Sequence, residues 1–181
     1  MKKTSYFLTL LALVVLMVPS LVWSESKRKG NPPVITNSFA VEKGYYGYAW
    51  KIYIEAEDPD GDMSRIATVV HQTGYGHYPT DWIMLKSPYR KHLKGYVQWN
   101  TYSRRTAYLR EWTNITLTIT IFDKAGHESN EVVFPFEFVS GAPQKINPPA
   151  PFNEEGLPKL GNIHIDLFEP TLMGADVQRD L

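Results

Sequence analysis

Two segments of the chain alternate apolar and polar residues with the period of a half-buried β-strand. In the first, residues 50–57, one face consists of Trp50, Ile52, Ile54 and Ala56. In the second, residues 115–122, aliphatic residues alternate with three threonines and a phenylalanine, a composition that disfavours a helix and suits a pleated sheet. Both segments are therefore predicted to be strands with one face in a core.

Weaker patterns of the same kind are found elsewhere before residue 140. Further strands are predicted at residues 34–41, 63–70, 95–100 and 131–139, with residues 82–85 as either a short strand or a helical turn. Gly126 lies in the turn after residue 122, where a positive φ is needed, so the strands on either side are predicted to form a hairpin.

Together these segments predict an all-β fold. About seven short strands, closely spaced turns and the lack of an amphipathic helix favour an antiparallel β-sandwich. We place this domain at residues 33–140, which is long enough for one hydrophobic core. The 181-residue chain contains no cysteine, so the core must stabilise the domain without a disulfide.

The N-terminal residues have the pattern of a secretion signal. Two lysines precede an apolar run over residues 7–18, and Ser24 marks a suitable cleavage position. Because the run is short for a membrane helix, residues 1–24 are predicted to be a signal peptide, with an uncleaved anchor as the alternative. Residues 25–32 are predicted to be a linker. The chain is therefore expected to be secreted, periplasmic or on the surface of a bacterial cell.

The C-terminal residues, 141–181, differ in composition from the rest of the chain. Six prolines are spread along them, and no alternation extends beyond residues 163–167. We predict a mostly disordered, proline-rich tail. Within it, residues 163–168 are candidates to add as a strand either to a partner or to the chain's own domain. A tail without any partner is the competing interpretation.

Two motifs resemble those of a known group of exported modules. One is the segment 119–130, and the other, directly after a strand that ends in Glu-Ala-Glu, is the acidic turn Asp58-Pro59-Asp60-Gly61-Asp62. Over residues 32–139 the chain resembles the bacterial immunoglobulin-like, cadherin-like and fibronectin type III-like modules. The resemblance implies an immunoglobulin-like β-sandwich and a role in adhesion, spacing or binding.

The resemblance also implies that two turns meet at one end of the sandwich. Strands B and C would be the segments on either side of the acidic turn, and strands F and G those on either side of residues 123–130. The turns B–C and F–G would then share a pole. Residues that are distant in the sequence would converge there, namely Asp58, Asp60, Asp62 and Asp123.

These four aspartates are the candidate ligands for calcium, the one cofactor that the sequence suggests. Clustered carboxylates and backbone carbonyls supply the oxygen ligands that calcium prefers. The spacing excludes an EF-hand, because Gly61 comes two places too early and no Glu follows where that motif needs it. The alternative is an ordinary solvated β-turn whose Asp side chains bond nearby amides.

Aromatic and basic residues are interleaved between residues 71 and 113. Candidates from this region for contact with a protein or a sugar are Tyr75, Tyr78, Trp82 and Trp112. The alternative is that the tryptophans of this region fill the core. Trp99 is the one most expected there, because it is in phase with an apolar neighbour.

No motif indicates catalysis, and we therefore predict that the protein is not an enzyme. The histidines lack metal-ligand spacing, and no nucleophile elbow is present. The 19 basic and 19 acidic residues balance, so the basic footprint of nucleic-acid binding is absent. We predict a non-catalytic exported binding or adhesion module for a protein or cell-envelope component. A carbohydrate-binding module for a glycan is the alternative, and a calcium-stabilised structural module is third.

Overall fold

The computed structural model describes residues 30–105, 113–141 and 146–168. The predicted signal peptide lies outside these ranges, and residues 30–32 are the part of the predicted linker that falls within them. Among the described residues, no helix is both long and apolar enough to cross a membrane.

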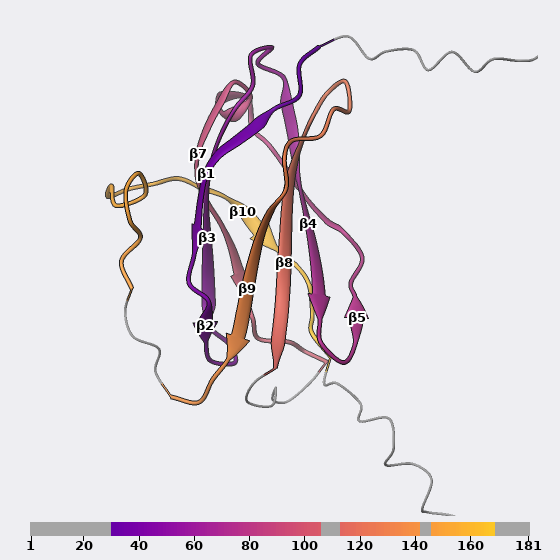
Figure 1. The fold of residues 1–181 in the computed structure, drawn as a ribbon, viewed down its shortest axis with the longest axis vertical. Helices are drawn as coiled ribbons and strands as arrows, with labels where there is room; N and C mark the ends of the chain where they lie inside the picture. Colours follow the sequence, from indigo (N-terminus) through magenta and orange to yellow (C-terminus); the bar gives the residue numbers. More distant parts are fainter. Residues whose placement is uncertain (1–29, 106–112, 142–145, 169–181) are drawn as a thin grey trace, which may run out of the picture.

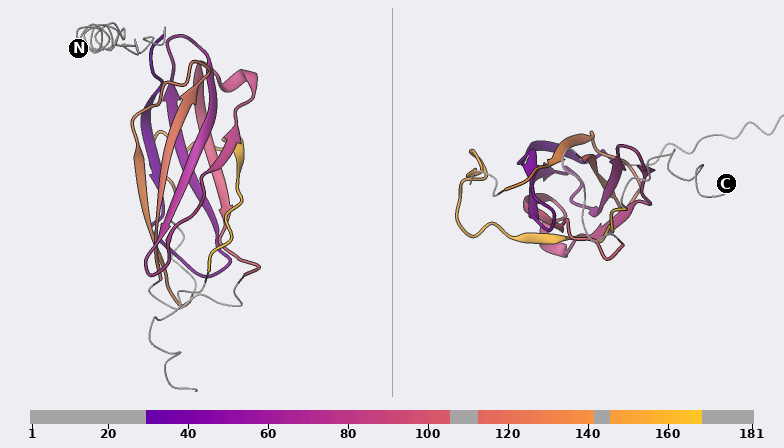
Figure 2. Two further views of the ribbon diagram at one scale, coloured as in Figure 1. Left: turned by 90° about the vertical axis from the view of Figure 1, so that its right-hand side faces the viewer. Right: turned by 90° about the horizontal axis from the view of Figure 1, so that it is seen from below.

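The described chain folds into two facing β-sheets (Figures 1 and 2). The four-stranded sheet has the order β1-β3-β7-β10, formed by Val34–Ala40, Ala49–Glu57, His92–Asn100 and Lys159–Ile163. The six-stranded sheet has the order β2-β9-β8-β4-β5, formed by Lys43–Gly44, Val132–Phe138, Asn114–Asp123, Met63–Gln72 and Gly76–His77. Its sixth strand, β6 (Asp81–Met84), pairs with β4, and a short 3-10 helix, η1 (Ser87–Tyr89), precedes β7.

This arrangement confirms the predicted all-β, immunoglobulin-like sandwich. Strands β3 and β8 bury their aliphatic positions and turn the alternate positions outward, as the sequence pattern requires. Strands β8 and β9 form the predicted antiparallel hairpin. Residues 81–84 form a strand, which decides between the two interpretations of residues 82–85.

Two strand pairs depart from the predicted antiparallel arrangement. Strand β2 runs parallel to β9, with Lys43 opposite Glu137, and β10 runs parallel to β7. Each of these strands is reached by a connection that crosses from one sheet to the other. Because no hairpin turn joins the paired strands, antiparallel pairing is not imposed on them.

The core between the sheets is rich in aromatic rings. The Trp50 ring packs against the Phe136 ring, with centroids 4.5 Å apart, and against the Trp99 ring, with centroids 6.2 Å apart. Trp99 is buried, as predicted. The buried Trp50 indole N–H donates to the Val41 carbonyl oxygen at 2.8 Å, so burial of this ring leaves no polar atom unpaired.

The C-terminal segment completes the core, and the fold therefore extends past the predicted boundary at residue 140. Strand β10 forms one edge of the four-stranded sheet. The segment adds four buried apolar side chains to the core, namely Leu160, Ile163, Ile165 and Leu167. Residues 146–168 thus belong to the domain and not to a disordered tail. Of the alternatives for residues 163–168, the structure shows docking on the chain's own domain.

Buried side chains from the middle of the chain hold the backbone of this segment. Trp99 Nε1 donates to the carbonyl oxygen of Ile165 at 3.0 Å, and Gln72 Nε2 donates to that of Phe168 at 2.7 Å. Both donors are buried, so each would be unsatisfied without the segment. The segment is therefore recognised through its main chain as well as through its apolar side chains.

Candidate functional site

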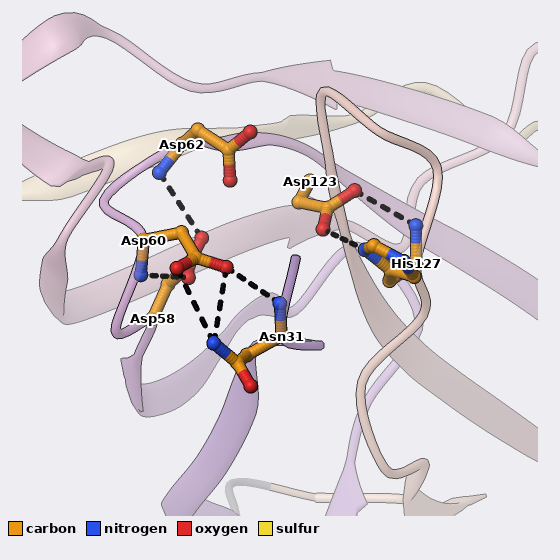
Figure 3. A network of polar contacts seen from close by, with 6 residues as sticks. All are labelled: Asn31, Asp58, Asp60, Asp62, Asp123 and His127. Atoms are coloured by element: carbon orange, nitrogen blue, oxygen red, sulfur yellow. Dashed lines mark hydrogen bonds and ion pairs between the residues drawn. The ribbon is translucent and has the colours of Figure 1, made fainter. Parts of the chain in front are cut away.

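Two turns that are distant in the sequence meet at one end of the sandwich, at the top of Figure 1. One joins β3 to β4, and the other joins β8 to β9. The Lys124 N–H donates to the Asp62 carbonyl oxygen at 3.1 Å, which links the two turns directly. The predicted convergence is therefore confirmed. We name the acidic pole after its four members, Asp58, Asp60, Asp62 and Asp123 (Figure 3).

Asp58 holds the β3–β4 turn together from inside. Its side chain is almost fully buried, and its two carboxylate oxygens accept the backbone N–H groups of Asp60 at 2.9 Å and Asp62 at 3.1 Å. Gly61 has a φ of 71°, which glycine adopts without strain, and its N–H donates to the Asp58 carbonyl oxygen. The Asp58 carboxylate thus bonds nearby amides, as the β-turn alternative predicted, and the exposed turn residues Pro59 and Asp60 surround a carboxylate that is itself buried.

Asp123 has the same role in the β8–β9 turn. It is buried, and its Oδ1 accepts the His127 backbone N–H at 2.7 Å while its Oδ2 lies 2.5 Å from His127 Nδ1. Asp60 connects the pole to the start of the described chain, because its Oδ2 accepts the Asn31 backbone N–H at 2.5 Å. Three of the four carboxylates are therefore engaged with backbone amides of their surroundings.

Asp62 differs from the other three. Its Oδ1 is shielded from solvent and has no hydrogen-bond partner in the described part of the chain. The pKa of Asp62 is raised, first by burial, then by a hydrogen bond to Asp58, and then by the negative charges of Asp123, Asp58 and Asp60. The fold therefore disfavours the charged form of this carboxyl, and a proton or a cation near Asp62 relieves the repulsion.

The calcium hypothesis is not supported by the arrangement of these side chains. Among the described residues, no group of three or more His, Asp or Glu side chains is placed to hold a metal ion. Asp58 and Asp123 point their oxygens at backbone amides, which a turn needs with or without a cation. Calcium binding at the acidic pole remains a prediction, and the geometry fits a structural role for the pole.

The candidate aromatic contact residues do not form one surface. Tyr75 is 47% exposed and Trp82 is 43% exposed, whereas Tyr78 is 6% exposed and donates its hydroxyl to buried Gln72. Tyr78 is therefore too buried to be a primary contact. Trp112 lies outside the described residues. The interpretation that the tryptophans of this region fill the core holds for Trp99 and is wrong for Trp82.

Tyr75 and Trp82 belong to separate clusters. Tyr75 lies in the turn after β4, at the end of the sandwich away from the acidic pole, and stacks on Phe168 with ring centroids 4.8 Å apart. Trp82 lies in β6, opposite Ala67 of β4. The Arg65 guanidinium lies 4.4 Å from the centre of the Trp82 ring. The exposed aromatics thus do not line the single flat surface that the carbohydrate alternative required of them.

One cleft, of about 450 Å³, brings a histidine and a carboxylate together. It lies beside Tyr75, and within it His164 Nδ1 is 3.6 Å from Asp81 Oδ2. The same oxygen accepts the His164 backbone N–H at 2.8 Å. Asp81 therefore anchors the C-terminal segment to β6, which is a structural use of the pair.

A surface that the sequence did not single out lies on the outer side of the six-stranded sheet. We call it the threonine face. Its central strand contributes Thr116, Thr118, Thr120 and Phe122, and its flanking strands contribute Arg65, Val69, Trp82, Met84, Val133 and Pro135. Met84 is 66% exposed and Val133 is 55% exposed. The sequence does not mark this face, because polar threonines at alternate outward positions of β8 are also what an ordinary solvated sheet carries.

The threonine face carries little charge. Arg65 is its one cation in the centre, and it lies over the Trp82 ring. At the β2–β9 edge, Lys43 and Glu137 neutralise each other in an ion pair with a distance of 2.9 Å. The outer side of the four-stranded sheet is different, because it carries Lys51 and Lys94 and is partly covered by residues 147–157.

Comparison with known proteins assigns no function to the chain. No protein-family model and no curated protein sequence matches the chain. Among solved structures, it is similar to the PKD domain of M14-like peptidase from Thermoplasmatales archaeon SCGC AB-540-F20, with a TM-score of 0.41 and 20% identity. The match covers 61% of this chain and 99% of that one. This match assigns neither a function nor any of the narrower families of the predicted resemblance.

Proposed function

We propose that this chain is a non-catalytic exported module that binds another protein through the threonine face. The observation that supports the proposal is the combination of exposure and low charge on this face. Trp82, Met84 and Val133 are exposed there, although a sheet side that only meets water normally carries polar residues. Trp82 and Met84 are neighbours on β6, whereas Val133 lies on β9 with β4 and β8 between. Exposed apolar groups gathered on one side of a sheet are typical of interaction surfaces.

The chemistry of the face specifies the kind of partner. An apolar surface complements Trp82, Met84 and Val133, and a carboxylate on the partner complements Arg65. A second copy of this chain fits less well. In a symmetric pair the same patch meets itself, and if the two-fold axis passed near Arg65 at the centre of the face, two guanidinium groups would approach each other. The partner is therefore a different protein that offers a flat apolar surface with an acidic group.

Binding is favoured over catalysis by how the titratable pairs are used. The His127–Asp123 pair closes a turn, and the His164–Asp81 pair anchors the C-terminal segment. Each carboxylate also accepts a backbone N–H, so both pairs have a structural use, although the His164–Asp81 pair lies in a cleft.

Site-specific crosslinking followed by reconstitution tests the proposal. A photo-reactive amino acid at position 133 should give a discrete adduct in cells, whereas the same probe at position 51, on the opposite sheet, should not. The crosslinked protein is then purified and its affinity for the chain measured. Trp82→Ala should weaken binding by about 2 kcal/mol or more, roughly thirtyfold, as for a central aromatic contact. Lys51→Ala should leave the affinity unchanged.

Two results would contradict the proposal. In the first, Trp82→Ala and Val133→Lys both bind the purified partner as tightly as the parent does, and thermal unfolding shows that both variants are folded. The other is a dimer of the purified chain in sedimentation that Trp82→Ala dissociates, because the face would then join two copies of this chain.

A further inference from the structure

A cleft of about 610 Å³ lies on the outer side of the four-stranded sheet, away from the threonine face. Its floor is formed by Tyr53 of β3 and Tyr96 of β7. Its wall is the segment 147–157, which stands away from the sandwich before β10 (Figure 2, right). The volume falls in the range of sites that hold small ligands, about 300–1,000 Å³.

The wall is fixed to the sheet at several points. Phe152 is buried and packs on Tyr53, with ring centroids 5.6 Å apart. Glu154 Oε1 lies 2.7 Å from Lys94 Nζ. The segment is thus attached to the sheet through both an apolar and a charged side chain. The cleft between them is therefore formed by the fold itself.

A glycine in β7 permits this attachment. The Tyr96 N–H donates to the Pro158 carbonyl oxygen at 3.0 Å, and a Cβ on Gly95 would lie 2.5 Å from the same oxygen. No side chain fits at that distance, so the close approach of the segment depends on Gly95. The sequence of β7 is therefore matched to the position of the wall.

The residues that line the cleft define the chemistry of its ligand. The floor offers two aromatic rings, on which Phe152 and Lys51 already pack in part, and the wall offers the amides of Asn147 and Asn153 and the carboxylate of Glu155. Aromatic faces stack on the C–H faces of sugar rings, while amides and carboxylates bond hydroxyl groups. A wholly apolar ligand would leave these polar groups unpaired.

The charges of the lining do not favour an anionic ligand. Among the described residues that line the cleft, Lys51 is the one cation and two are glutamates. Lys51 is placed over the Tyr96 ring, with Nζ 4.7 Å from the ring centre, and Glu154 is paired with Lys94. Phosphate or carboxylate groups would therefore meet repulsion from Glu155. We infer that the cleft between the Tyr53–Tyr96 floor and the 147–157 wall binds a neutral sugar unit of a glycan.

Saturation-transfer NMR on the full-length chain tests this inference. The probes are glucose, galactose, mannose, N-acetylglucosamine, cellobiose and chitobiose, each at millimolar concentration. At least one should receive saturation from the protein. Asn153→Ala changes an exposed side chain and should fold normally, yet it should weaken binding by about tenfold. Tyr96→Ala should weaken binding at least as much. Trp82→Ala is the matched control on the opposite sheet and should leave sugar binding unchanged.

Each other outcome overturns the inference. A panel without transfer shows that the cleft takes no neutral sugar. Transfer that survives both Asn153→Ala and Tyr96→Ala places the sugar elsewhere on the chain. If Trp82→Ala abolishes the saturation transfer, the sugar binds at the threonine face. Because the protein partner is tested through Trp82 and the sugar through Asn153, either proposal can fail without the other.

Discussion

Replacing Leu167 by alanine tests whether the C-terminal segment is part of the core. Leu167 has 0% exposure and lies 27 positions beyond the predicted end of the domain at residue 140. If the segment were an unfolded tail, truncating this side chain would have no effect on stability. If the segment is docked as the structure shows, the substitution opens a cavity in the core.

The expected loss follows from the burial of Leu167. Leucine to alanine at fully buried sites costs about 2–5 kcal/mol, which combines the transfer of the lost methyl groups with the cavity that remains. A loss of about 3 kcal/mol in a domain of this size lowers Tm by roughly 10 °C. The Ser103 hydroxyl still donates to the Leu167 carbonyl oxygen, because the backbone is unchanged. The cost is therefore that of packing alone.

Urea and thermal unfolding, followed by circular dichroism, measure this loss. Asn162→Ala is the matched control, since Asn162 is an exposed residue of β10 in the same segment and should change stability by less than about 0.5 kcal/mol. Unfolding curves of Leu167→Ala that coincide with those of the parent would refute the docking of the segment and restore the boundary at residue 140.

Three further predictions concern the acidic pole. Asp58→Ala should lower the unfolding free energy in urea titrations by about 2–4 kcal/mol, because two backbone N–H groups lose a carboxylate acceptor, while exposed Asp60→Asn should cost less. Asp62→Asn should be more stable than the parent near pH 7 and equal to it below about pH 4. The reason is that the raised pKa of Asp62 makes the folded state bind the proton more tightly than the unfolded chain does. The stability of the parent therefore falls as pH rises from the ordinary pKa to the raised one. A stability difference between Asp62→Asn and the parent that does not change with pH would contradict this prediction. If calcium binds here, calcium at 100 times its Kd should raise the free energy of unfolding by about 2.7 kcal/mol relative to a sample with chelator. Asp62→Asn should reduce that gain. Unfolding curves that coincide with and without calcium would show that calcium does not bind.

The strands could be predicted wherever one face of the sheet is buried and the other is solvated. Residues 50–57 and 115–122 show this alternation, and the structure places strands β3 and β8 there. Strand β10 escaped prediction because it is short and Gly161 lies at its centre. A Cβ on Gly161 would lie 2.4 Å from Ile83 Cγ2, so glycine is required there by packing against a distant strand. Such long-range requirements interrupt the local pattern.

The site was predictable in position and not in chemistry. The sandwich topology brought Asp58 and Asp62 near Asp123, as expected from the order of the strands. Sequence spacing does not show where carboxylate oxygens point, and two of these three are turned to backbone amides. The exposure of Trp82 was equally hidden, because it depends on β6 pairing with β4 at the edge of a sheet.

The docking of the C-terminal segment also determines whether the sugar cleft exists. The wall of the cleft, residues 147–157, is tied to the sandwich between β9 and β10, and the Tyr96–Pro158 hydrogen bond lies directly before β10. Leu167 is buried ten positions beyond the end of the wall and keeps β10 in place. Conditions that release β10 should therefore remove the wall and expose Tyr53 and Tyr96 together. In Leu167→Ala, sugar binding should then be lost at a lower urea concentration than in the parent, in parallel with unfolding, while Asn153→Ala should lose sugar binding with its stability intact.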